Sequence, residues 1–171
     1  PISLEDLVGA STIGDKGDYS SKSQSHYDNC VWDLGKQWII SNRAGAVTAA
    51  YQYYTTGDAS YHLEMCQKLG LVFHAAQDFY AHSNWIENNP DGVTADLEGT
   101  KPSYWMSGTW PYDYPQSSTA GAPTHGDLNK DYPLRRGYDE AYNDAVAETK
   151  KQFALFQDRK STRLNSSHGI I

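Results

Sequence analysis

Two histidines and an aspartate recur at intervals of four residues in the middle of the chain. They are His74, Asp78 and His82, within the run LVFHAAQDFYAHSNWIE. An α-helix turns about 100° per residue, so residues at i, i+4 and i+8 lie within roughly 80° of one another on one face. Imidazole nitrogens and carboxylate oxygens are both zinc ligands. The spacing therefore predicts a divalent-metal site, with zinc as the expected ion, on a helix.

The same spacing bears on the number of ions. The Cα atoms of His74 and His82 should lie about 12 Å apart, at about 1.5 Å of rise per residue. Zinc–nitrogen bonds are only about 2.0–2.1 Å long, so one ion beside Asp78 cannot reach both histidines. We therefore expect each histidine to serve a different ion, with Asp78 bridging two ions roughly 3.5–4 Å apart.

An alternative needs no metal, because His and Asp four residues apart also form stabilising pairs on an exposed helix face. The flanking side chains argue against exposure, since Leu71, Val72, Phe73 and Phe79 are apolar on nearly every side. A helix that is apolar all round is buried. Buried polar groups need partners, and a metal ion would supply them.

Two further histidines lie outside this helix. His26 stands beside Asp28, and His125 lies beside Asp127 in a loop rich in Gly and Pro. Loops carry function more often than their share, so both histidines are candidate ligands, although either fits an ordinary loop residue. His62 lies about 120° away from the metal-binding face and is interpreted as structural.

Apolar spacings of three and four residues predict three helices, over about 28–56, 59–87 and 138–156. Residues 89–136 show no strand pattern and form a long loop rich in aromatic residues. The predicted fold class is therefore all-α, a helical bundle with one long loop in a single domain. The expected helix boundaries are an N-cap at Asp28 or Asn29, a stop at Gly57 and a second N-cap at Asp58.

Composition limits the partners of this domain. The formal net charge is −7 and no Lys/Arg cluster is present, which argues against sequence-independent nucleic-acid binding. The sequence contains no run of about 18 apolar residues, so no transmembrane segment is predicted.

The aromatic and cysteine residues leave alternatives open. The 13 Tyr and five Trp fit either a core beside a polar cleft or a Tyr-rich surface. Cys30 and Cys66 would pair in an oxidising compartment or remain two buried thiols.

The C-terminal segment has a different origin in this interpretation. Residues 158–168 read DRKSTRLNSSH, which resembles the usual translation of a sequencing-adapter oligonucleotide. Residues 158–171 are therefore expected to be a non-native tail. Residues 1–157, which begin at Pro1 without a Met, are expected to be a single helical metal-binding domain and a fragment of a longer protein.

Three motifs resemble those of Het-C-type proteins. Residues 74–87 match the pattern H-x-x-Q-D-F-Y-A-H-S-N-W-x-E, residues 26–29 are similar to H-F-D-N, and residues 124–131 are similar to a loop ending in N-K-D. The resemblance spans about residues 26–150. More distantly, the helix that carries His74 and Asp78 is similar to that of zinc-dependent phospholipases C and S1/P1-type nucleases, in which a Pro precedes the second His.

This resemblance implies an all-helical, secreted zinc protein with two or three ions and a phospholipid or other phosphodiester as substrate; the protein partner is unknown. It implies metal ligation by His26, His74, Asp78, His82 and His125, with Asp78 also catalytic. It implies that ligands or substrate are positioned by Asp28, Asn84, Glu87, Asp127 and Asp139. Asn84 and Glu87 would alternatively cap the helix end.

One departure from the phospholipase pattern leaves the activity open. The late helix lacks the expected His, and Asp139 is its only acid beside the apolar stripe, while Glu140, Asp144 and Glu148 are expected to face water. One hypothesis is thus a zinc-dependent hydrolase of phosphoesters. A second is a non-enzymatic Het-C-type interaction protein with a structural or degenerate metal site, and a third is a metal-free bundle. Trp105, Trp110 and Tyr112 would line a lipid-headgroup pocket or belong to the core.

Overall fold

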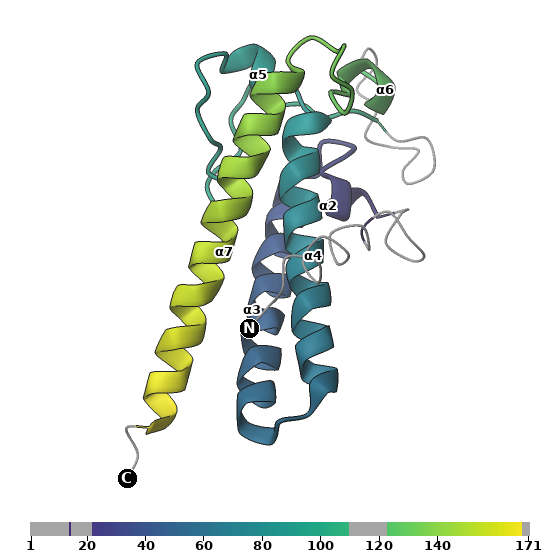
Figure 1. The fold of residues 1–171 in the computed structure, drawn as a ribbon. Helices are drawn as coiled ribbons and strands as arrows, with labels where there is room; N and C mark the ends of the chain where they lie inside the picture. The colour runs from purple at the N-terminus through teal and green to yellow at the C-terminus, as the bar shows by residue number, and fades with distance from the viewer. Residues whose placement is uncertain (1–13, 15–21, 110–122, 169–171) are drawn as a thin grey trace.

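The computed structural model describes Gly14, residues 22–109 and residues 123–168, with side chains described as far as residue 165. Three long helices dominate these residues: α3 (Trp32–Thr56), α4 (Ala59–Ala81) and α7 (Tyr138–His168). Helices α3 and α4 form an antiparallel hairpin, and α7 runs alongside it (Figure 1). Within the described ranges the only β pairing is two isolated bridges, Ser83–Ser107 and Thr109–Thr124. The all-α prediction is confirmed.

The turn between α3 and α4 follows the predicted boundaries. Gly57 ends α3 in the left-handed region at φ 72°, and its N–H donates to the carbonyl of Tyr53. Glycine adopts this conformation without a Cβ clash. Asp58 caps α4, because its carboxylate accepts a hydrogen bond from the backbone N–H of Ser60.

The start of the first long helix was predicted wrongly. Its N-cap is Val31 rather than Asp28 or Asn29, and a separate short helix, α2 (Ser23–His26), precedes it. Asp28 and Asn29 are buried between the two helices. The carboxylate of Asp28 pairs with the imidazole of His125, so a tertiary contact occupies the oxygen that would have capped the helix.

The second predicted helix, over residues 59–87, is interrupted. Helix α4 ends at Ala81 and a short helix, α5 (Trp85–Asn88), follows it. In the break, the carbonyl of His82 accepts from Gly108 N–H and the N–H of Asn84 donates to the Met106 carbonyl. The chain leaves the helix here because its backbone pairs with a segment that lies more than 20 residues later.

An aromatic cluster lies beneath this end of α4. The rings of Tyr27, Trp32, Phe79 and Trp105 contact one another, with Phe79 stacked on Trp105 at 5.7 Å between centroids. All four are buried. Trp105 thus belongs to the core rather than to a headgroup pocket. The headgroup-pocket alternative for Trp110 and Tyr112 falls outside the described residues.

Helix α7 buries acidic side chains that were expected to face water. Asp144 is 4% exposed and Glu148 is fully buried, so that prediction was wrong for both. Gln152 and Lys151 hydrogen-bond to the carboxylate of Glu148, which satisfies its oxygens inside the bundle. Glu140 is exposed, as expected.

The same helix continues beyond its predicted end at residue 156 to His168. Arg163 donates a hydrogen bond to Thr48 of α3, so the segment over residues 158–168 contacts the bundle at this residue. Its non-native origin stays a prediction. Cys30 and Cys66 are not joined by a disulfide; Cys66 is a buried thiol, as the second alternative expected, whereas Cys30 is only half-buried. In the described part of the chain, no helix has the length and apolar character needed to cross a bilayer.

Candidate metal centre

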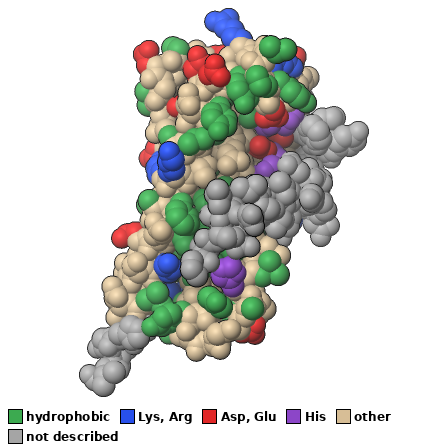
Figure 2. Space-filling view, viewed as in Figure 1, with side chains coloured by type: hydrophobic (Ala, Val, Ile, Leu, Met, Phe, Trp, Pro, Cys, Tyr) green, Lys and Arg blue, Asp and Glu red, His purple; other side chains and the backbone are tan. Residues whose placement is uncertain are grey.

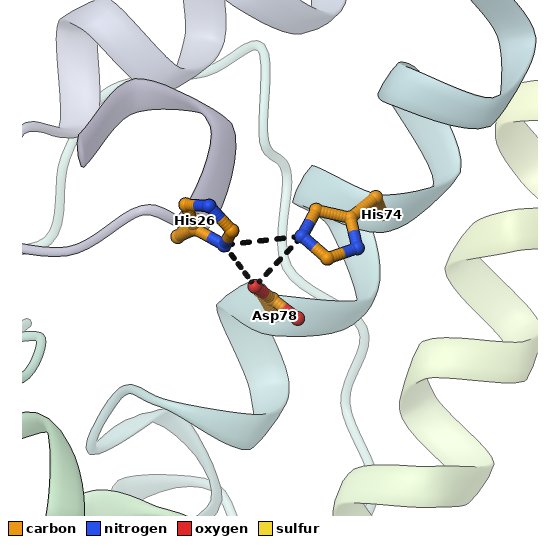
Figure 3. A group of neighbouring side chains, drawn as sticks. All are labelled: His26, His74 and Asp78. Carbon is orange, nitrogen blue, oxygen red and sulfur yellow. Dashed lines mark hydrogen bonds and ion pairs between the residues drawn. The ribbon is translucent and has the colours of Figure 1, made fainter. Parts of the chain in front are cut away.

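Three of the predicted ligands meet in space. His26 Nδ1 lies 2.7 Å from Asp78 Oδ2, His74 Nε2 lies 3.2 Å from the same oxygen, and the two imidazole nitrogens are 3.0 Å apart. Figure 3 shows the three side chains converging, His26 from α2 and the other two from α4. They form a group that can hold a metal ion. We call it the triad.

Helix periodicity and core packing together position the triad. His74 and Asp78 lie one turn apart on α4, so their side chains share a face. His26 is the last residue of α2, and Tyr27 follows it in the left-handed region at φ 57°. The Tyr27 ring is fully buried against Phe79. This buried ring fixes the direction in which the neighbouring His26 imidazole points.

The Asp78 carboxylate supplies the negative charge that a cation needs, whereas His26, whose pKa is raised, must lose its proton before it can bind one. Burial by itself would raise the pKa of the Asp78 carboxyl, but His74 and the hydrogen bonds from both imidazoles hold that pKa well below its usual range. Burial would lower the pKa of His26, yet the Asp78 carboxylate outweighs burial and raises it. Asp78 is therefore an anion whose Oδ2 both imidazoles face.

The donor set also fits a metal ion in size. Ligands about 2.0–2.2 Å from a tetrahedral zinc ion lie about 3.4 Å from one another. The three donor atoms of the triad are 2.7, 3.0 and 3.2 Å apart. A shift of a few tenths of an ångström at each atom would open the triangle enough, which flexible side chains can provide.

A second group of titratable side chains lies on the other side of Asp78. His82 Nε2 is 3.9 Å from Asp78 Oδ1 and 3.5 Å from Asp131 Oδ2. The His82 ring stacks on His125, with 3.8 Å between centroids, and His125 Nδ1 lies 2.9 Å from Asp28 Oδ1. We call His82, His125, Asp28 and Asp131 the second histidine group. The two oxygens of Asp78 thus face different sets of side chains.

Burial and hydrogen bonding act on this group in opposite directions. The pKa of His82 is lowered, because the effect of burial is larger than the opposing effect of the nearby Asp78 carboxylate. Burial raises the pKa of Asp28, despite its hydrogen bond with His125. For His125 the Asp28 carboxylate outweighs burial, and the pKa is raised.

Asp131 was missed by the sequence analysis, which selected Asp127 from the same loop. The Lys130–Asp131 pair at the end of the N-K-D motif carried the signal. Lys130 is buried, its N–H donates to the Ala81 carbonyl, and its Nζ donates to Ser83 and Leu128 carbonyls. These bonds fasten the loop to the end of α4 and bring Asp131 beside His82.

His125 is brought into place by a glycine. His125 is the first residue of the short helix α6 (His125–Leu128), and its backbone N–H donates to the carbonyl of Thr109. A Cβ on Gly108 would lie 2.3 Å from the His125 Cα atom. Only glycine lets these two backbone segments approach so closely.

The remaining predicted residues contact loops or helix ends. Asn84 donates to the Tyr104 carbonyl and accepts from Met106 N–H, which secures the loop after α5. Glu87 pairs with Lys130 at 3.0 Å. Asp127 forms a capping box with Thr124 at the start of α6, and Asp139 is exposed in the first turn of α7.

The histidines of the triad and of the second histidine group lie in one half of the molecule. In Figure 2 purple His side chains and red carboxylates gather on the upper right of the visible face. The C-terminus of α4 and helix α6 lie toward the top of Figure 1, and α2 lies below them, beside α4.

Comparison with known proteins identifies the family. The family model for the VWA7 N-terminal domain matches residues 10–103, more than half of the chain. The chain belongs to the VWA7 N-terminal domain family. In this VWA7 N-terminal domain, the matched segment contains the whole triad and His82, whereas His125 and Asp131 lie beyond it. No curated protein and no solved structure matches the chain. The resemblance to Het-C-type proteins and phospholipases C therefore rests on the sequence motifs alone.

Proposed function

We propose that this domain is a zinc-dependent hydrolase of phosphoesters, with the triad as its primary metal site. The observation that carries the proposal is the convergence of His26, His74 and Asp78 from two separate helices. Two imidazoles and one carboxylate are a ligand set of catalytic zinc sites, in which a further coordination position stays open. A bound zinc ion would supply an activated water and Lewis acidity toward a phosphoryl oxygen.

The second histidine group supports a second ion in this proposal. Asp78 presents Oδ2 to the triad and Oδ1 to His82, which is the arrangement that a bridging carboxylate needs. Asp131 and His82 would complete the donors on that side. Asp28 would orient the imidazole of His125 through its Nδ1 atom, as carboxylates commonly do for ligand histidines.

Substrate class follows from the chemistry of such a site. Two cations close together hold phosphate oxygens well, and a phospholipid or other phosphodiester presents them. The net charge of −7 disfavours a polyanionic substrate such as DNA, so a small or lipid phosphodiester is the favoured choice.

The proposal is tested by zinc content per chain and by turnover of a chromogenic phosphodiester. We expect bound zinc, turnover that chelation abolishes, and loss of both in His74→Ala. His62→Ala is the matched control, since His62 lies on the same helix and its ring contacts Tyr53 instead. His82→Ala and Asp131→Asn should retain one ion per chain and lose the second. Bound zinc without turnover on several phosphodiesters would reject the enzyme.

A non-enzymatic alternative is favoured by one observation. The late helix α7 offers no histidine at its start, where Tyr138 and Asp139 stand. A zinc ion would then serve as a structural link between α2 and α4, and the domain would act by binding a protein. Under this alternative, chelation lowers thermal stability while no activity exists to be lost.

A further inference from the structure

Two loops flank the C-terminal end of α4, and both are tied to it by backbone hydrogen bonds. Gly108 N–H donates to the carbonyl of His82, and Lys130 N–H donates to the carbonyl of Ala81. The loop residues next to these contacts therefore surround the end of the helix that carries Asp78 and His82.

Both loops expose large apolar side chains at this end. Leu134 is 100% exposed and Tyr132 is 63% exposed, and Tyr104 and Met106 of the other loop are exposed as well. We call these four side chains the loop rim. Tyr132 directly follows Asp131, which lies 3.5 Å from His82. The rim therefore lies next to the candidate metal centre.

Positive charge adjoins the rim. Arg135 and Arg136 directly follow Leu134 and are exposed. Arg135 donates to the carbonyl of Gly126, which holds its guanidinium near the start of α6. Asp131, Asp139 and Glu140 are nearby acids in sequence, so the charge is mixed rather than uniformly basic. Figure 2 shows green apolar and blue Lys/Arg side chains at the same end as the upper histidines.

We propose that the loop rim docks this domain onto a phospholipid surface and so presents lipid phosphodiesters to the metal centre; the proposal rests on the proposed function. Tyr and Arg favour the lipid–water interface, where an apolar body and a polar tip are both satisfied. Leu134 inserts among fluid acyl chains, which can surround this side chain without a preformed pocket of matching shape. Arg135 and Arg136 meet lipid phosphates, whose geometry guanidinium matches.

The mixed charge makes docking nearly insensitive to the charge of the membrane. Because Asp131, Asp139 and Glu140 offset the two arginines, the rim gains little from a strongly anionic surface, and apolar insertion provides most of the affinity. Binding to vesicles should therefore depend weakly on salt and on the fraction of anionic lipid.

Vesicle flotation of the full zinc-loaded chain tests the proposal, with vesicles of phosphatidylcholine, with and without phosphatidylglycerol. We expect flotation with both, and a vesicle affinity reduced about tenfold or more in Leu134→Asp, since the apolar side chain that inserts is replaced by a charged one. Leu63→Asp is the matched control, because Leu63 is also exposed, at 59%, but lies near the opposite end of α4; this variant should float like the parent chain.

Failure of docking and failure of the enzyme proposal can be told apart. Leu134→Asp should still hydrolyse a water-soluble phosphodiester, and His74→Ala should lose that turnover yet still float. Absence of flotation, or equal loss in Leu63→Asp, would overturn the docking proposal. So would a chain that self-associates through the rim, seen as a dimer that Leu134→Asp converts to a monomer while neither form binds vesicles.

Discussion

The Oδ2 atom of Asp78 lies 2.7 Å from Nδ1 of His26, although 52 residues separate the two along the chain. The contact joins the end of α2 to the last turns of α4. Asp78 also faces His74 with the same oxygen and His82 with the other. This single carboxylate therefore connects every histidine implicated in the centre except His125.

Substituting Asp78 by Asn should abolish metal binding with little change in shape. The amide keeps the volume of the side chain but removes the negative charge that both imidazoles face. We expect zinc affinity to fall by more than about 100-fold, since loss of a residue that merely supports a ligand already costs 10–100-fold. Isothermal titration with zinc measures the change. Asp58→Asn, which alters only the cap of α4, should bind zinc normally.

Replacing Gly14 by Ala should disturb the His74 imidazole. A Cβ at this position would lie 2.1 Å from Cδ2 of His74, so either the ring or the Gly14 segment must move. Because the ring is held within the triad, we expect zinc affinity to decrease by about tenfold, or about 1.4 kcal/mol. The control is Gly126→Ala, whose Cβ meets only Thr124 Oγ1 at 3.8 Å. Equal affinities for the two variants would show that Gly14 does not restrain His74.

Removal of zinc should lower the melting temperature. An ion bound only to the folded state, at about a thousand times its dissociation constant, stabilises a protein by about 4 kcal/mol. For a chain of this size that corresponds to a shift of about 10 °C. Differential scanning fluorimetry with and without a chelator measures it. His74→Ala should melt at one temperature under both conditions; a shift of the same size in that variant would point to zinc bound elsewhere.

Stability at neutral pH should depend on the ion pair between Glu98 and the buried Arg43. Their closest atoms are 2.7 Å apart, and the hydrogen bond from Arg43, against the effect of partial burial, holds the pKa of Glu98 below its usual value. A lowered folded-state pKa stabilises the protein above the unfolded-state pKa, and this stabilisation is lost as pH falls through the folded-state value. We expect Glu98→Gln to cost about 1 kcal/mol at pH 7.

The test is denaturant unfolding of the parent chain and Glu98→Gln at several pH values. The difference between the two should shrink toward zero as pH falls below the lowered folded-state pKa of Glu98. Glu64→Gln serves as the comparison, because Glu64 lies 3.7 Å from Lys68 in an exposed pair and should have little effect at any pH. A difference that is constant with pH would mean that Arg43 does not require the charge of Glu98.

Local spacing was sufficient to predict part of the fold and part of the centre. The periodicity of α4 placed His74 and Asp78 on one face, and Gly57 and Asp58 ended and began helices where expected. These features depend on residues within about one helical turn of each other, for which geometry is nearly fixed by chain connectivity. The sequence thus determined the helical class and the core of the ligand set.

Contacts between distant segments decided the rest. His26 reaches Asp78 because the Tyr27 ring is buried against Phe79, and Asp131 reaches His82 because Lys130 is fastened to the end of α4. The same long-range packing made Asp28 a partner of His125 instead of a helix cap and buried Glu148 beside Gln152. Side-chain spacing along the chain carries no record of such contacts, since they depend on which surfaces meet once the helices pack.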